Sequence, residues 1–570
     1  MRLLTASALL FALGSAVVAQ QTTATVTGII TDASGAPVAN VRVKATRTQT
    51  NAVRETTTNE AGSYSLPFLA AGSYNLDTTK EGFQSGKVVS LALQVGLTAR
   101  VDIQIKVGNV TESVNVEASA AVLQTENATV GSVIDAQKIV DLPLNGRNFI
   151  QLAQLIPGAQ ASTPGSITVR RGRGSIGQAD SSFGSTGFSA NGSRDTANRF
   201  FLDGIEVMDY DAMTYSFSPS IDSLAEFKVE TANYSAESGG APGGHVNMLT
   251  KRGGNIFHGT LWEFNRNDAL TQTYDAIAQR SLPNPRLNRN QFGANLGGAV
   301  RIPKLYNGKD KTFFFFNWES GRNAQGAIPG IRTVPIADFR NGDFRRLVNA
   351  RTGAPITLLD PQGIPIAHNI IPRSALSPQA LAFLAFTPLP NNTGANPLVN
   401  NFINNPVSAI SKQDNYNARI DHQFSSKDSV FGRFVFNDTF EAGVPYWGND
   451  QRDNLGRTKN LSLGYTRTVS ASIVNELRGG YHNFYENETF GTTGRADFDV
   501  ANKMGLPLVS KDPKFFGPPV VNITGNEGGF STFGLQRTIG PRERSGYHAA
   551  RTSYPLESLF APHHQLWRSL

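Results

Sequence analysis

The 570-residue sequence predicts a mostly β protein built from three successive parts: an N-terminal β-sandwich, a central α+β region and a C-terminal series of antiparallel strands. Three observations predict this fold class. Short alternating segments separated by glycine turns fill residues 23–107. Glycine clusters alternate with short apolar segments between Gly192 and Gly254. After residue 257, longer segments place apolar or aromatic residues at every second position, which is the period of a β-strand.

The first residues indicate export. Arg2 precedes an uncharged apolar segment, Leu3–Val18, and Val17 and Ala19 fit the −3 and −1 positions of a cleavage site. This segment is shorter than the roughly 20 residues of a membrane-spanning helix. We therefore predict a signal peptide at residues 1–19. The sequence contains no cysteine, which excludes disulfides and cysteine-bound metals.

The basic residues do not predict a nucleic-acid partner. The formal net charge is +7 and the isoelectric point is near 9.4, but the basic side chains are scattered along the sequence. Their one cluster, Arg170–Arg173, is interpreted as part of a solvated loop. Residues 172–177 fit the pattern G-x-G-x-x-G, but a poor helix-forming sequence follows, so no dinucleotide site is predicted.

Residues 23–107 are predicted to form the sandwich. Short strands at close spacing, separated by glycine turns, are typical of a small β-sandwich. The pattern resembles the carboxypeptidase regulatory-like (transthyretin-like) domain, and this resemblance implies no peptidase activity. The matching residues are Gly28, Asp32, Gly35, Pro37, Val38, Val41, Gly62, Tyr64, Gly72, Tyr74, Gly82 and Phe83.

Residues 108–118 are predicted to be a connector. Val110–Ala118 alternates β-branched with polar residues, which is typical of a strand. Two interpretations stay open. The segment is the last strand of the sandwich, or it is an exposed strand that adds to the sheet edge of another protein.

Residues 119–254 are predicted to form the central domain. A short helix or turn is expected at Ala136–Val140, and a helical segment from Phe149 is expected to stop at Pro157 and Gly158. Residues 160–198 are rich in glycine, serine and threonine and are predicted to be a loop.

Three motifs in this domain resemble, in the same order, those of the plug domain of Oar-like TonB-dependent outer-membrane receptors. They are Leu142–Phe149, Phe201–Val207 and His245–Lys251. The residues that match are Asn145, Gly146, Arg147, Asp203, Gly204, Gly243, Gly244, Asn247 and Lys251. The resemblance implies an α+β plug domain inside a transmembrane β-barrel. It also implies a TonB box in the connector, for which the candidates are Val110, Thr111, Glu112, Ser113, Val114, Asn115 and Val116.

Residues 255–545 are predicted to form a partial antiparallel transmembrane β-barrel. Short polar turns such as Ser425–Asp428 alternate with long connections such as residues 321–410, as in membrane barrels. About eight strands can be counted, whereas plugged barrels of this class have about 22. The barrel is therefore expected to be incomplete. Because the alternation stops, residues 546–570 are expected to be an atypical tail of a truncated or frame-shifted product.

No catalytic, metal or cofactor site is predicted. Asp203, Glu206, Asp209 and Asp211 form an acidic cluster, but their spacing is not that of a calcium loop and favours a structural loop. The sequence shows no H-E-x-x-H pair, and no carboxylate pair or Ser/His/Asp group can be assigned.

The resemblance implies a function in gated import. An external ligand would bind the outer loops and the plug, and TonB would then engage the TonB box and transmit energy, a coupling between two faces of the molecule. The expected partners are TonB, with ExbB and ExbD indirectly, outer-membrane lipid and lipopolysaccharide, and an unidentified oligosaccharide, peptide or siderophore. The expected location is the outer membrane, with the N-terminal domain in the periplasm. The alternatives are a non-transporting surface-binding or adhesion protein and a periplasmic carbohydrate-processing enzyme.

Overall fold

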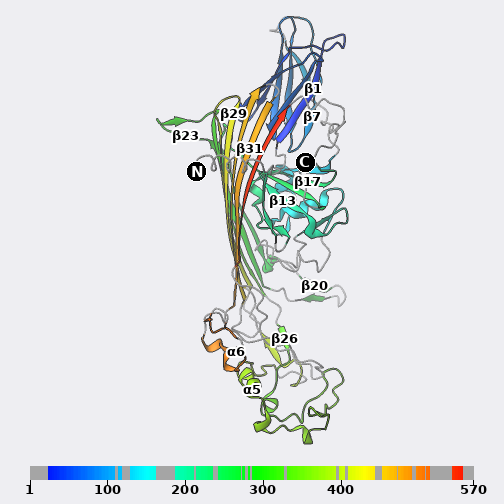
Figure 1. The fold of residues 1–570 in the computed structure, drawn as a ribbon, viewed down its shortest axis with the longest axis vertical. Coiled ribbons are helices and arrows are strands. Elements are labelled where there is room, and N and C mark those ends of the chain that lie inside the picture. The colour runs from blue at the N-terminus through cyan, green and yellow to red at the C-terminus, as the bar shows by residue number, and fades with distance from the viewer. Residues whose placement is uncertain are drawn as a thin grey trace, which may run out of the picture.

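A computed structural model gives the fold of the protein, shown in Figure 1. It describes residues 23–108, 113–117, 129–161, 187–210, 213–234, 242–270, 273–275, 280–282, 286–326, 330–392, 397–404, 409–442, 452–470, 473–490, 496–507, 509–513, 516 and 542–555. The predicted signal peptide and the cluster Arg170–Arg173 lie outside the described residues. Within these ranges, no helix is both long enough and apolar enough to cross a membrane.

The N-terminal part is a β-sandwich, as the glycine-punctuated alternation predicted. One sheet has the order β4-β1-β7, with β8 also on β1, and the other has the order β3-β2-β5-β6-β9. The bounds are β1 (Thr23–Thr31), β2 (Arg42–Arg47), β3 (Val53–Thr57), β4 (Ser63–Ala70), β5 (Gly72–Thr79), β6 (Ser85–Leu93), β7 (Thr98–Arg100), β8 (Ile103–Gln104) and β9 (Ser113–Glu117).

The two sheets enclose an apolar core that includes Val26, Val43 and Leu76, each fully buried. Gly28 shows why a glycine is needed at one matching position. A Cβ atom there would lie 1.9 Å from the carbonyl oxygen of Val101, so only glycine lets β1 approach this segment so closely. Burial of every second residue of the strands against the opposite sheet accounts for the alternation in the sequence.

The connector forms β9, which pairs in parallel with β6 at the edge of the five-stranded sheet. This pairing corresponds to the first of the two interpretations, a last strand of the sandwich. Of the TonB-box candidates, Ser113, Val114, Asn115 and Val116 belong to β9, whereas Val110–Glu112 lie outside the described residues. A role of this segment as a TonB box stays a prediction.

The central domain contains a five-stranded mixed sheet in the order β10-β17-β18-β13-β14. Its strands are β10 (Val130–Asp135), β13 (Arg199–Leu202), β14 (Ile205–Glu206), β17 (Leu224–Ala232) and β18 (His245–Thr250). The helix α2 (Ala136–Asp141) and the 3-10 helix η2 (Phe149–Leu155) lie where helical segments were predicted. Phe149 packs edge-on against Phe227, with ring centroids 5.7 Å apart, in the core of this domain.

One prediction for the central domain is wrong. Residues 160–198 were predicted to be loop, but β11 (Ala159–Ala161) pairs antiparallel with β12 (Phe188–Ala190). Short strands of this length leave almost no periodicity in a sequence, and Phe188 is fully buried because tertiary packing places it in the core. The smaller elements are η1 (Asn145–Arg147), η3 (Asp195–Ala197), β15 (Met208–Asp209), β16 (Thr214–Tyr215) and η4 (Ile221–Ser223).

The C-terminal part is one eight-stranded antiparallel sheet with strongly elongated strands (Figure 1). Its order is β19-β22-β25-β28-β29-β30-β31-β32. Each strand therefore pairs with the strands of this sheet that come directly before and after it along the chain. The bounds are β19 (His258–Asn267), β22 (Leu287–Ala299), β25 (Thr312–Gln325), β28 (Ala409–Gln423), β29 (Asp428–Ala442), β30 (Arg452–Ser470), β31 (Ile473–Phe490) and β32 (Arg542–Pro555).

The two faces of this sheet have opposite chemistry. The face toward the central domain carries buried polar side chains, among them Asn317, Asn417, Arg419, Arg433 and Asn460. Alternate residues of the strands point to the opposite face. Many of these are exposed and apolar, among them Phe316, Tyr416, Ile420, Phe434 and Leu463. Polar residues inside and apolar residues outside are the arrangement of a membrane barrel, because its outer face meets lipid.

The ends of the sheet also differ. At one end, near the sandwich, short turns such as residues 424–427 join the strands. At the other end lie long connections, including residues 326–408 between β25 and β28. This asymmetry was predicted.

The prediction of an atypical tail at residues 546–570 is wrong for residues 546–555, which form part of β32 in continuous register with β31. The segment lacks clear apolar alternation, so its strand depends on backbone pairing with β31. Residues 556–570 lie outside the described residues.

The long connections form a small packed unit at their end of the sheet. Val334, Phe383, Phe402 and Val500 make its core, and these residues come from two different connections. Phe386 of the first packs 6.3 Å from Phe498 of the second, measured between ring centroids. The elements of these connections are β26 (Gly330–Arg332), α4 (Ala337–Arg340), η7 (Ala367–Asn369), η8 (Arg373–Ala375), α5 (Pro378–Leu384), β27 (Phe402–Asn404), η9 (Ala496–Phe498) and α6 (Val500–Lys503). Other connections of the sheet contain η6 (Asp268–Leu270), β20 (Thr273–Asp275), β21 (Arg280–Leu282), β23 (Arg301–Ile302) and β24 (Tyr306–Asn307).

Candidate functional site at the contact between central domain and sheet

Asp203 lies at the centre of the contact between the central domain and the long sheet. It begins the two-residue turn Asp203-Gly204 between β13 and β14, and both residues have positive φ, 49° and 83°. An Asp-Gly turn favours this geometry because glycine and aspartate tolerate left-handed backbone conformations. The turn places the Asp203 carboxylate against the polar face of the sheet.

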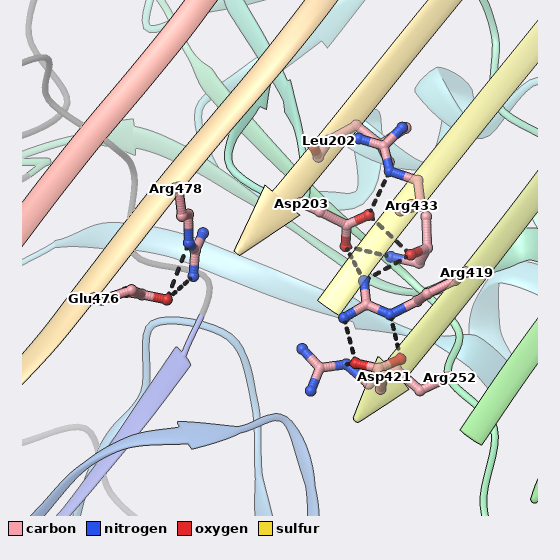
Figure 2. Close-up of polar contacts among 9 residues, drawn as sticks. Leu202, Asp203, Arg252, Arg419, Asp421, Arg433, Glu476 and Arg478 are labelled. Carbon is pink, nitrogen blue, oxygen red and sulfur yellow. Dashed lines mark hydrogen bonds and ion pairs between the residues drawn. The ribbon is translucent and has the colours of Figure 1, made fainter. Parts of the chain in front are cut away.

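Two arginines of the sheet pair with this carboxylate, as Figure 2 shows. Arg419 Nη1 of β28 lies 3.2 Å from Asp203 Oδ1, and Arg433 Nε of β29 lies 3.0 Å from Oδ2. Arg433 Nη2 also donates a hydrogen bond of 3.0 Å to the carbonyl oxygen of Leu202. The side chains of Arg419, Arg433 and Asp203 are 1%, 0% and 3% exposed, so water screens these pairs little.

The network continues back to the central domain. Arg419 makes a bidentate contact with Asp421, with Nε to Oδ2 at 2.8 Å and Nη2 to Oδ1 at 2.9 Å. Asp421 Oδ1 in turn lies 3.9 Å from Nε of Arg252, which follows β18. Charges of alternating sign therefore run from Asp203 through Arg419 and Asp421 to Arg252. We call these residues together with Arg433 the charged lock.

Hydrogen bonds and charge keep Asp203 ionised despite its burial. Burial raises the pKa of Asp203, but the positive charges of Arg419 and Arg433 lower it, and so do two hydrogen bonds from Thr250. The backbone N–H of Thr250 donates at 3.1 Å and its hydroxyl at 2.8 Å. The net result is a pKa below the usual value. Burial and the nearby Arg419 lower the pKa of Arg252 to about 10, so it stays charged at neutral pH.

A second contact lies around Arg147. Its guanidinium pairs with Asp222 within the central domain, and its Nε lies 3.5 Å from Glu319 Oε2 of β25. Ser220 Oγ donates a 2.9 Å hydrogen bond to the same Glu319 oxygen. The Arg147 guanidinium also lies over the ring of Phe264 of β19, at 4.5 Å from the centroid, which favours a cation.

The remaining motif residues support the local fold. Gly243 and Gly244 leave no room for a side chain, since a Cβ atom would lie 2.6 Å from the Ala197 backbone or 2.8 Å from the Phe188 ring. Gln291 Nε2 of β22 donates a 3.2 Å hydrogen bond to the Gly146 carbonyl. Lys251 donates its backbone N–H to Ser223 at 2.8 Å, Asn247 is buried on β18, and Asn145 begins η1.

Of the acidic residues singled out in the sequence, Asp203 and Glu206 have different partners. The carboxylate of Asp203 faces arginines, whereas Glu206 Oε1 accepts from Arg199 Nη1 at 2.6 Å and its other oxygen accepts from Tyr210. Asp211 lies outside the described residues. The arrangement of Asp203 and Glu206 thus serves packing within the domain and against the sheet.

Sequence reasoning found Asp203 and Arg147 but missed their partners in the sheet. Arg419, Asp421, Arg433, Glu319 and Arg252 were not singled out. One signal was present: Arg419 and Asp421 stand two residues apart, and therefore on the same side of a strand. Which strands oppose the Asp203 turn depends on tertiary contacts between residues more than 200 positions apart.

The sandwich also contacts both other parts. Arg54 Nη1 donates hydrogen bonds of 3.2 and 3.3 Å to the carbonyl oxygens of Ser426 and Lys427, in the turn between β28 and β29. On the central domain, Glu226 Oε1 accepts a 2.7 Å hydrogen bond from the backbone N–H of Val95. Burial raises the pKa of Glu226 to about 7.

Comparisons with known proteins define the class of protein. A family model described as outer membrane beta barrel domain matches residues 249–550, which is more than half of the chain, and a model of the carboxypeptidase regulatory-like domain matches residues 25–106. The chain belongs to the outer membrane beta barrel domain family, and its location is the outer membrane. In this context the long sheet is barrel wall.

One named transporter is also similar in sequence to this chain. The chain is similar to the TonB-dependent transporter Oar of Myxococcus xanthus, with 28% identity over 316 residues. The match covers 53% of this chain and 27% of that protein, so the chain spans about a quarter of the relative's length.

Two solved structures align with part of this chain. The outer membrane transporter YddB of Escherichia coli aligns with a TM-score of 0.40 and 10% identity, over 63% of this chain and 39% of that one. A mutant of the ferric enterobactin receptor PfeA of Pseudomonas aeruginosa aligns with a TM-score of 0.36 and 14% identity, over 64% of this chain and 42% of that one.

Proposed function

We propose that this chain carries the gate, the N-terminal domain and part of the barrel wall of a TonB-dependent receptor that takes up an extracellular ligand. The observation that carries the proposal is the charged lock, which joins a folded plug to the inner face of a membrane sheet through buried pairs. Breaking such pairs is costly, because each buried charge would lose its partner. A gate held in this way opens only when work is done on it.

TonB is the source of that work in this proposal, with ExbB and ExbD acting through it. The strand β9 (Ser113–Glu117) precedes β10, the first strand of the plug, in the chain, so a pull on β9 acts on the segment that leads to β10. The short-turn end of the sheet would face the periplasm, together with the sandwich. The long connections would face outward and bind the ligand, an oligosaccharide, peptide or siderophore.

Capture by TonB tests the proposal. The full chain in lipid vesicles is mixed with the purified C-terminal domain of the host's TonB, and bound TonB is measured. We expect saturable binding that is lost in Val114→Pro, because proline removes a backbone donor and disfavours pairing by the connector. Val114→Thr is the matched control and keeps binding, since strand addition depends mainly on main-chain hydrogen bonds. Equal binding by all three chains, or none by the unmodified chain, contradicts the proposal.

Gate opening is tested separately in cells. Ser216 is 2% exposed where the plug meets β30, and its carbonyl oxygen accepts from Thr458 Oγ1 at 3.5 Å. Because the chain has no native cysteine, Ser216→Cys gives a single thiol. We expect maleimide labelling of this thiol to be higher in cells with TonB than in cells without it. Ser34→Cys, in an exposed turn of the sandwich, serves as the control and labels equally in both. A surface-binding protein without transport would show no dependence on TonB at either position.

A further inference from the structure

The strand β9 occupies an edge that the sandwich provides. Its five residues pair in parallel with β6, with Ser85 opposite Ser113, Lys87 opposite Asn115 and Val89 opposite Glu117. The strand β6 pairs with β5 on its other side, so β9 covers what is otherwise the last strand of this sheet. An uncovered strand edge of this kind is a template for pairing with another strand.

The receiving edge is fixed in position. An isolated bridge between Phe83 and Val107 holds the chain just before the connector. The sandwich itself is attached to the barrel turn through Arg54 and to the plug through the Val95–Glu226 hydrogen bond. The connector therefore has a preformed pairing partner within reach of a short tether.

A tethered internal partner competes strongly with an external one. A short linker gives an effective concentration on the order of millimolar, so even a weak parallel pairing stays populated. An external protein that pairs with the same backbone edge then binds only the released fraction, and its apparent affinity falls by that fraction.

We infer that the sandwich is an internal competitor of TonB: its strand β6 sequesters Ser113–Glu117 as β9, and TonB pairs with this segment only after it leaves β6. The inference rests on the proposed function, because it concerns the regulation of the same connector. In this scheme the N-terminal domain sets how often the connector is available. Signals that loosen the sandwich from the plug or from the barrel turns would raise the capture of TonB.

A reversible cross-link tests the inference. Lys87→Cys combined with Asn115→Cys places two thiols on directly paired residues of β6 and β9, at neighbouring-strand spacing that allows a disulfide. Lys87 lies between the buried residues Gly86 and Val88, so its side chain belongs to the outer face of the sheet. The absence of native cysteine makes the cross-link unique.

The control locks two other strands of the same sheet. Lys44→Cys combined with Asp77→Cys joins β2 to β5, which are paired at these residues and do not include the connector. Both double variants are placed in lipid vesicles, oxidised or reduced, and assayed for binding of the C-terminal domain of TonB. Formation of the disulfide is checked by cleaving the chain between the two cysteines. The two fragments run together on a non-reducing gel only if the disulfide joins them.

The inference predicts that oxidation of the β6–β9 pair lowers TonB binding by roughly tenfold or more, and that a reductant restores it. The control pair binds equally in both states. Equal binding by the oxidised and reduced β6–β9 pair overturns the inference, since TonB would then add to β9 in place, while the proposed function stands. Failure of the two thiols to cross-link also overturns it. If the reduced chain and the unmodified chain bind no TonB, the proposed function fails, and the inference with it.

Discussion

The sandwich and the barrel wall use the same sequence pattern in opposite ways. Both alternate apolar and polar residues with a period of two. In the sandwich, the apolar set is buried, for example Val43 and Leu76, whereas in the long sheet the buried set is polar, for example Asn317 and Arg433. Alternation therefore specifies a two-faced strand, and the surrounding medium decides which face turns inward.

The polar inner face of the barrel wall also affects how the central domain is held in place. An apolar core holds a domain by burial alone, with a gain proportional to area. The central domain also has an apolar contact with the wall, at Val435 of β29, but most of the contacts described above between the two are ionic and polar and depend on each partner. The charged lock can therefore hold the plug tightly and still be undone by the loss of one charge.

Asp203→Ala is expected to have the largest effect. It leaves Arg433 buried without its carboxylate partner, and breaking a buried pair in this way costs about 3–5 kcal/mol. The expected result is a plug that unfolds or separates from the wall at a lower urea concentration, reported by labelling of the thiol in Ser216→Cys. Unchanged labelling and an unchanged urea midpoint would show that the lock does not hold the plug.

Leu463→Arg tests the outward apolar face. Leu463 is 51% exposed, so the change would be nearly neutral in a protein surrounded by water. In a barrel wall it is expected to cost about 2–4 kcal/mol if the residue lies near the bilayer midplane. The measurement is the equilibrium of folding into lipid vesicles.

The matched control for this change is Val89→Arg, which places the same charge on a 46% exposed apolar position of the sandwich. We expect little effect from it. Equal costs at the two positions would contradict the assignment of opposite surroundings to the two sheets.

Glu226 tests the junction between the two regions through pH. Burial raises its pKa from 4.5 to about 7 in the folded chain. Below pH 4.5 the carboxyl is protonated in both states and folding carries no penalty. As the pH rises from 4.5 to 7, the unfolded chain releases its proton first and the folded state loses stability, by about 3 kcal/mol in total.

Glu226→Gln is expected to remove this dependence and to keep an acceptor for the Val95 N–H. The measurement compares urea midpoints of the two chains at pH 5 and pH 8. The difference between the chains should be small at pH 5, with Glu226→Gln the more stable at pH 8. Parallel curves for the two chains would show that Glu226 is not buried at this junction.

Arg457→Ala is expected to have the smallest effect. Arg457 Nε lies 2.8 Å from Asp438 Oδ1, but the two side chains are 50% and 37% exposed. Exposed pairs contribute about 1 kcal/mol or less, because water and salt screen them. A urea midpoint close to that of the unmodified chain is expected. A loss as large as that of Asp203→Ala would remove the distinction between buried and exposed pairs in the wall.

Much of the architecture could be predicted from the sequence because it depends on local periodicity. The glycine-separated strands of the sandwich, the helix at Ala136–Asp141 and the long alternating strands after residue 257 all follow from patterns within about ten residues. The three motifs resembling a plug domain also selected Asp203 and Arg147, which both lie at the contact with the wall.

Other features could not be predicted because their determinants lie far apart in the sequence. The strand β32 has little alternation of its own and is defined by its pairing with β31. The strands β11 and β12 are separated by residues 162–187 and are too short to show a period. The connector allowed two interpretations, and its parallel pairing with β6 is a property of the folded sandwich.

Local patterns in the sequence specify two-faced strands in three successive parts, and short motifs in it resemble those of an outer-membrane family. The folded chain sets which partners face one another: Asp203 faces Arg419 and Arg433, and β9 pairs with β6. The physical reason is that period and turn chemistry are encoded in neighbouring residues. The partner of a buried charge or of a strand edge is chosen by packing, because a charge or a backbone group removed from water must be satisfied by whatever the fold brings to it.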